Sequence, residues 1–248
     1  MSVEFHLPPG VVFYLAGIPV TSTIIAAWLA SAVLIALSLA ATRRMALIPG
    51  GLQNFIEFVV EGLLTLCEQV AGPRGRAFLP LVGTLFLFIV TANWMGILPF
   101  YAESNWAHPV PWTASHGPPL RSANSDLNVT AAMAVIVFLW VQVTRIRTAG
   151  LLGWLKHLTW GPPPLLELIA EIARPVSLAL RLFGNILAGE VLLLVMSGLV
   201  PVAVPALFMG FELFVGVVQA LIFAILTLAF LVLASAHHGA GAHHEAGH

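Results

Sequence analysis

Long apolar stretches without a charged residue dominate the chain. The first runs from Val20 to Thr42, and it provides the about 20 residues that a helix needs to cross a bilayer. A second uncharged stretch covers residues 77–102, and a third follows Asp126. Either Asp126 or Ser125 is suited to be the N-cap of a helix there. We therefore predict membrane-spanning helices at 20–42, 77–102 and 126–144.

The last two apolar stretches, 165–199 and 206–236, are longer than a bilayer requires. A continuous helix over the first would be about 50 Å long at 1.5 Å per residue, against a hydrocarbon core of about 30 Å. A helix of that length fits only if it is steeply tilted. We predict two long, strongly tilted spanning helices, with Pro175 as a candidate kink in the first.

The stretch from 51 to 71 has a different pattern. Gln53, Glu57, Glu61 and Glu68 fall on one side of a helix at about 100° per residue, and apolar residues surround them. This predicts an amphipathic helix that lies flat on the cytoplasmic side. Its polar stripe is acidic, which favours a protein partner over anionic lipid, with an ordinary interfacial elbow as the alternative.

Composition supports a membrane protein. Of 248 residues, 59% are hydrophobic and 8% are charged, and the mean hydropathy is +0.97, whereas about a quarter of the residues of a soluble domain are charged. We predict an all-α polytopic membrane protein, a single membrane domain over 1–248 with five spanning helices and one amphipathic interfacial helix. Ten basic against eleven acidic residues give no surface for nucleic acid. The single cysteine, Cys67, excludes an internal disulfide and a multi-cysteine metal site, and we expect no cofactor and no metal.

The basic residues predict the orientation in the membrane. Only Arg121 falls in the loop between the second and third spans, Glu103 to Ser125, whereas seven basic residues fall on the other side: Arg43, Arg44, Arg74, Arg76, Arg145, Arg147 and Lys156. Because cytoplasmic loops carry the excess of Lys and Arg, we expect the N-terminus outside and the C-terminus in the cytoplasm. The His-rich end, 237–248, is expected to be a solvated flexible tail, with a metal-binding or proton-collecting role as the alternative.

Arg181 is the residue that most needs an explanation. A guanidinium stays protonated and costs about 2.5–3.5 kcal/mol at the centre of a spanning helix. Asn185 lies one turn beyond it, and Glu190 lies half a turn round the helix, facing a different direction. On the last helix, Glu212 and Gln219 share a face. Three costly charges in one hairpin indicate a mechanism rather than packing.

Burial of a carboxylate at membrane depth favours its neutral form, so such a group can bind and release protons near neutral pH. We hypothesise that Glu190, Glu212 and Gln219 line a proton path from the outside. Near the cytoplasmic start of the helix, Glu167 and Glu171 could line a second path, and Arg181 between the two would repel a proton that moves straight through. Two simpler interpretations stay open: Asn185 and Gln219 could only hold helices together, and Glu171 with Arg174 could be an interfacial ion pair.

The segment PVSLALRLFGN at 175–185, followed by Ala188, Gly189 and Glu190, closely resembles the signature of subunit a of rotary F-type ATP synthases. Further matches lie at 51–54, 93–99, 126–130 and 219–223, so the resemblance covers roughly 45–235. It implies a stator subunit that forms two offset half-channels against a ring of c subunits. In that family pattern Arg181 matches the essential arginine that faces the ring carboxylate. Asn185, Glu190 and Gln219 match polar channel residues, Glu167 matches an acidic cytoplasmic-side position, and Glu212 stands where some members carry histidine.

The resemblance also implies partners and a location. They are the c-subunit ring, the peripheral-stalk b subunits, other ATP synthase subunits and the lipid bilayer, in a bacterial plasma (inner) membrane. The chain has no phosphate-binding glycine motif, so nucleotide chemistry would occur elsewhere and the chain would not be catalytic alone. A proton-coupled secondary transporter is the alternative, but it predicts repeated halves that the sequence does not show. A purely structural assembly subunit would leave Arg181 unexplained.

Overall fold

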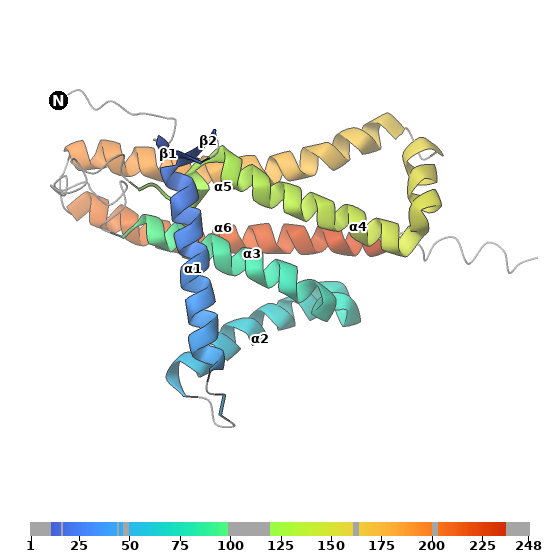
Figure 1. Ribbon diagram of the computed structural model, residues 1–248, viewed down its shortest axis with the longest axis horizontal. Helices are drawn as coiled ribbons and strands as arrows, with labels where there is room; N and C mark the ends of the chain where they lie inside the picture. The colour runs from blue at the N-terminus through green and yellow to red at the C-terminus, as the bar shows by residue number, and fades with distance from the viewer. Residues whose placement is uncertain are drawn as a thin grey trace, which may run out of the picture.

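The computed structural model describes residues 11–15, 17–43, 45–46, 50–98, 120–160, 164–199 and 203–236. These residues form a short β-hairpin, six α-helices and two short 3₁₀ turns, η1 and η3 (Figure 1). In chain order the elements are β1 (Val11–Leu15), β2 (Ile18–Thr21), α1 (Ser22–Thr42), α2 (Gly51–Ala71), η1 (Gly72–Arg74), α3 (Gly75–Gly96), η3 (Ala123–Ser125), α4 (Leu127–Trp160), α5 (Pro164–Leu199) and α6 (Ala203–Ala236).

Five helical stretches of the described chain are long and apolar enough to cross a membrane. They are Ser22–Thr42, Gly51–Gly96, which joins α2 to α3, Leu127–Gly150, Ile169–Leu193 and Val204–Ser235. The predicted all-α polytopic fold class is confirmed, and the chain is an integral membrane protein.

Helices α3 to α6 lie along one another, and their facing sides form the main apolar core. The largest wholly buried side chains of this core include Ile89 of α3, Leu182 of α5 and Phe223 of α6. In Figure 1, α1 runs across the direction of α5 and α6. These helices therefore cannot all stand along the membrane normal, which agrees with the predicted tilt of α5 and α6.

Helix α1 joins the others through small side chains. Ala26 and Ala30 are buried against Ala92 and Met95 of α3. Small residues allow close backbone approach, and this close packing drives helix association where lipid is as apolar as the side chains.

The link between α2 and α3 is a tight elbow. Gly72 adopts a φ of 59° after the last residue of α2, a conformation that favours glycine. Gly75 then lies so close to the backbone of α2 that an added Cβ would stand 2.5 Å from the carbonyl oxygen of Cys67. On α2, Leu63 and Cys67 are buried, while Glu57 and Glu61 of the acidic stripe are exposed.

The β-hairpin before α1 was not predicted. β1 and β2 pair antiparallel, with Phe13 opposite Val20 and Leu15 opposite Ile18. Gly17, with a φ of 84°, supplies the turn. Its strands are short and lie next to an unmistakable spanning helix, so the two-residue period of the hairpin gave a weak signal.

Helix α4 also differs from expectation, because it does not end at Thr144. It continues past Thr144 to Gly150, whose φ of 71° and ψ of 161° interrupt the helix, and a second helical segment then follows to Trp160. The charge at Arg145 marked the expected end of the span, but this side chain is buried against α5. The helix therefore runs past the point at which its sequence becomes charged, and Arg145 forms an ion pair with Glu171 there.

The elbow yields a first prediction. Gly75→Ala would place a methyl group against the backbone of Cys67, so α2 must move away from α3, and the purified chain should lose about 1–3 kcal/mol of stability. Thermal unfolding in detergent measures the change. Gly62→Ala on α2 is the matched control, because nothing lies within 4 Å of its added Cβ; equal melting temperatures for the two variants would contradict the prediction.

Candidate functional site

Arg181 lies on an open side of α5. Its side chain is exposed, as is that of Leu180, which is 52% accessible, whereas Leu178 and Leu182 are buried in the core. Within the described part of the chain, the Arg181 guanidinium makes no hydrogen bond or ion pair with a neighbour. A permanent cation therefore stands on an apolar helix face that the rest of the described chain leaves uncovered.

A cavity of about 160 Å³ lies between α5 and α6, beside this face. Asn185 and Ala188, one and two turns after Arg181, line it on α5, and Phe211 lines it on α6 with 60% of its surface exposed. The exposed sides of the two helices meet at this cavity. Its full lining is Asn185, Ala188, Gly189, Leu192, Leu193, Phe208, Phe211, Glu212 and Val215.

Glu212 is the acidic group of this cavity. Its carboxylate lies against the backbone of Gly189, where any Cβ would collide with Oε1 of Glu212. Oε2 of Glu212 is buried and has no hydrogen-bond partner among the described residues. The cavity therefore combines an unsatisfied carboxylate oxygen with the Asn185 amide in a space large enough for a few water molecules.

Glu190 is buried and is not among the residues that line the cavity. Its Oε2 forms an ion pair with Nη2 of Arg121, which lies just before η3. The side chains of Arg121 and Glu190 are 12% and 5% exposed. The sequence placed Arg121 in an external loop as a lone outside charge, and this pairing was missed because the two residues lie 69 positions apart.

The two carboxylates of the predicted outer path still influence each other. Glu190 and Glu212 are close enough to repel each other electrostatically, and Oε1 of Glu190 has no hydrogen-bond partner among the described residues. The sequence therefore identified an acidic pair that the fold does bring together. The cation beside one of its members was not foreseen.

Gln219 lies on α6, beyond Glu212, and is buried, and its Nε2 has no described partner. Close to it in the sequence, the Gly216 carbonyl accepts a hydrogen bond of 3.2 Å from Nδ2 of Asn93. Asn93 in turn accepts one of 2.6 Å from Nδ2 of Asn124. This amide chain ties α3 and η3 to α6, and Asn124 was absent from the predicted site because a loop asparagine carries no sequence period.

The start of α4 is fixed by Asp126, which accepts a hydrogen bond of 2.7 Å from the Thr23 hydroxyl of α1. Its other oxygen accepts one of 2.9 Å from the backbone N–H of Asn128. Asp126 thus caps α4 as the sequence predicted and also holds α1. The segment that carries Arg121 is therefore held to α5 by the ion pair with Glu190 and to α1 by the hydrogen bond between Thr23 and Asp126.

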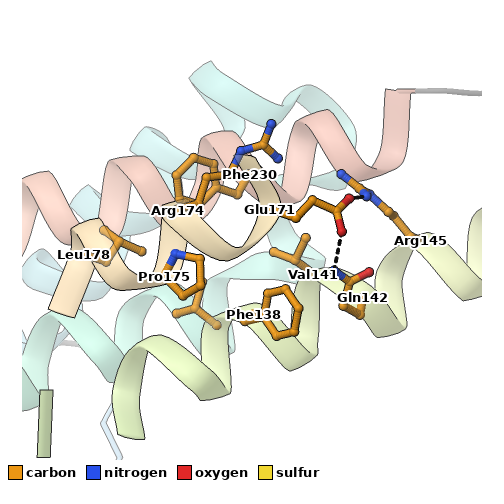
Figure 2. A pocket seen from close by; sticks show the side chains of 10 residues that line it. Phe138, Val141, Gln142, Arg145, Glu171, Arg174, Pro175, Leu178 and Phe230 are labelled. Carbon is orange, nitrogen blue, oxygen red and sulfur yellow. Dashed lines mark hydrogen bonds and ion pairs between the residues drawn. The ribbon is translucent and has the colours of Figure 1, made fainter. Parts of the chain in front are cut away.

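At the other end of α5, Glu171 forms an ion pair with Arg145 of α4 (Figure 2). The alternative pairing of Glu171 with Arg174 is wrong: the Arg174 guanidinium lies over the ring of Phe230, 5.6 Å from its centroid. The expected inner path named Glu167 beside Glu171. The side chain of Glu167 and the tail 237–248 lie outside the described residues.

Within the described ranges, no group of three His, Cys, Asp or Glu side chains is placed to hold a metal ion.

Comparisons with known proteins place this chain in a family. The family model described as "ATP synthase A chain" matches residues 24–232. The chain is 34% identical over 228 residues to "ATP synthase subunit a" of Moorella thermoacetica, covering 91% of this chain and 96% of that protein. It is 36% identical over 210 residues to "ATP synthase subunit a 3" of Pelobacter propionicus (82% and 83%) and 36% over 217 residues to "ATP synthase subunit a" of Trichlorobacter lovleyi (85% and 85%). The chain belongs to the ATP synthase A chain family.

The buried pair yields a second prediction. Arg121→Ala leaves the Glu190 carboxylate buried without its cation, so the purified chain should lose about 3–5 kcal/mol of stability. Thermal unfolding in detergent measures this loss. Arg76→Ala is the matched control, because it breaks the exposed pair with Glu68, and exposed pairs contribute about 0–1 kcal/mol. Equal losses of stability in Arg121→Ala and Arg76→Ala would contradict the prediction that the buried pair contributes more to stability than the exposed one.

Proposed function

We propose that this member of the ATP synthase A chain family is the proton-conducting stator subunit of a bacterial ATP synthase. The observation that carries the proposal is Arg181, exposed on an apolar helix face with no counterion among the described residues. A cation at membrane depth is costly unless a counter-charge compensates it. A carboxylate on a partner that packs on this face would supply that charge.

The partner that fits is a ring of c subunits carrying one membrane-embedded carboxylate each. The exposed apolar side chains beside Arg181 on α5, and those of Leu207, Phe211 and Phe214 on α6, support a protein or lipid contact here. When a ring carboxylate is ionised, it is attracted to Arg181. When it is protonated, it can leave this position and move into lipid without a buried charge.

The outer half-channel is proposed to run through the cavity between α5 and α6. Glu212 and Asn185 line this cavity, and Glu190 lies close to Glu212. Gln219, two turns beyond Glu212 on α6 and buried, is proposed as a further polar group of the path. A proton entering from outside would pass through these groups and neutralise a ring carboxylate near Arg181.

The inner half-channel is proposed to start at Glu167, at the cytoplasmic end of α5. A ring carboxylate that has completed most of a turn would lose its proton there and then meet Arg181. Because the two half-channels are offset, the proton can cross only by riding on the ring. The fixed charge of Arg181 repels a proton that would pass directly between the half-channels.

The energy for rotation comes from the membrane potential. Each charge that crosses the membrane releases about 2.3 kcal/mol per 100 mV. The chain would convert this energy into ring rotation and would catalyse no reaction by itself. ATP synthesis would take place on other subunits of the complex.

The proposed setting is a bacterial inner membrane, with the N-terminus outside and the C-terminus in the cytoplasm. Peripheral-stalk b subunits would hold this chain against the rotating ring. The acidic stripe on α2, with Glu57 and Glu61 exposed, is a candidate contact for another subunit. A proton-coupled secondary transporter is not favoured, because the family and its named relatives are ATP synthase subunits.

The third prediction tests the role of Arg181. Arg181→Ala removes the fixed cation, so ATP-driven proton pumping should be lost in vesicles that contain the purified complex. Acidification of the vesicle interior, followed with a pH-sensitive dye, measures pumping. Arg147→Ala, which removes an exposed arginine of α4, is the matched control. Normal pumping by Arg181→Ala would refute the proposed function.

The fourth prediction concerns the cavity. Glu212→Gln keeps the size of the side chain but removes its titratable group, so pumping should slow and its pH profile should change. Glu190→Gln is expected to have the same direction of effect. Initial pumping rates between about pH 6 and pH 9 would measure both effects. This range brackets the near-neutral pH at which a buried carboxylate can bind and release protons. An unchanged profile would remove that glutamate from the proposed path.

A further inference from the structure

Arg145 and Glu171 form a buried connection between α4 and α5 (Figure 2). Their side chains are 8% and 7% exposed. Gln142, one turn before Arg145, donates a hydrogen bond of 3.1 Å from Nε2 to Oε2 of Glu171. Both oxygens of Glu171 are therefore engaged by α4, one by a cation and one by an amide.

The surroundings of this pair are apolar and narrow. The cavity beside it measures about 20 Å³, and Val137, Val141, Leu178 and Phe230 are among its lining residues. This volume holds about one water molecule. Among the described residues, the site therefore resembles a packed contact between helices more than a wide aqueous path along which a carboxylate exchanges protons.

Glu171 pairs with Arg145 of α4 rather than with Arg174 on its own helix. Arg174 follows Glu171 by three positions on the same helix, a spacing at which ion pairs form readily. Its guanidinium instead lies over Phe230 of α6, and Figure 2 shows Arg145, not Arg174, joined to the Glu171 carboxylate. Glu171 thus holds α5 to α4, while Arg174 contacts α6.

The position of the pair along α5 gives it mechanical importance. Glu171 lies one turn before Pro175, which removes a backbone hydrogen bond and marks a point where the helix can bend. Arg181 lies ten residues beyond Glu171, about 15 Å along the helix. A change in the direction of α5 at this point would displace Arg181 from its place on the open face.

We propose that the Arg145–Glu171 pair is a fixed clamp, that is, a contact that sets the direction of α5 and thereby positions Arg181. In this proposal Glu171 does not transfer protons along the inner half-channel. The inference rests on the proposed function, in which the placement of Arg181 decides whether proton flow is coupled to the ring. In this account Arg145 and Glu171 are positioning residues, and Glu167 alone is the acidic group of the inner path on this part of α5.

A clamp and a proton carrier respond differently to paired apolar substitution. Removal of one partner leaves a buried charge uncompensated, whereas replacement of both by apolar side chains of similar size can preserve the helix contact. If Glu171 only holds α5, Arg145→Met combined with Glu171→Leu restores function. If Glu171 transfers protons, no apolar residue can replace it.

The experiment compares Arg145→Met, Glu171→Leu and the double variant in vesicles that contain the whole complex. The amount of assembled complex and the number of protons pumped per ATP hydrolysed are both measured. The second quantity matters because a variant that only lowers assembly leaves it unchanged. We expect each single variant to lower this ratio several-fold and the double variant to return it close to that of the unmodified complex. Thr144→Val, next to Arg145 on α4, is the matched control.

Two outcomes overturn the clamp. One is a double variant that assembles normally but pumps as poorly as Glu171→Leu; the other is a Glu171→Leu variant with an unchanged ratio. If neither single variant assembles, the double variant decides, because its recovery or failure to recover is measured directly. Arg181→Ala in the same vesicles separates the two hypotheses. If this variant pumps protons, the proposed function is refuted. If it does not pump and the double variant also fails to recover, only the clamp is refuted.

Discussion

The cost of a charge at membrane depth governs the arrangement of α3 to α6. Four of the arginines in or beside these helices meet that cost in different ways. Arg121 and Arg145 are buried against Glu190 and Glu171, Arg174 lies over an aromatic ring, and Arg181 is exposed on an apolar face. Because the first three have contacts within the chain, the fourth stands out as the cation directed at something outside it.

The carboxylates divide in the same way. Glu171 is enclosed by a cation and an amide, and Glu190 has one oxygen paired and one without a described partner. Glu212 keeps its carboxylate beside a cavity. The contacts of the three groups match their proposed roles. Glu171, which is fully engaged, is proposed to position α5, whereas Glu190 and Glu212, which are only partly engaged, are proposed to exchange protons.

Close backbone approach makes these contacts possible. The Glu212 carboxylate occupies the place where a side chain at Gly189 would be, and Gly216 lets the Asn93 amide reach a helix carbonyl. In a bilayer, helices gain little from burying apolar surface against each other, so close packing and interhelical hydrogen bonds contribute a large share of the association. Glycine at these positions therefore shapes the site as directly as the polar residues do.

The sequence by itself determined the membrane class and the long apolar helices, and it singled out Arg181, Glu190 and Glu212 as candidate site residues, because hydrophobic length, helical period and the cost of a buried charge are local properties. It did not determine which charges compensate each other. Arg121 and Glu190 are 69 positions apart, and Gln142 and Glu171 are 29 apart on different helices. Only the tertiary structure decided these pairs, since they depend on how the helices cross.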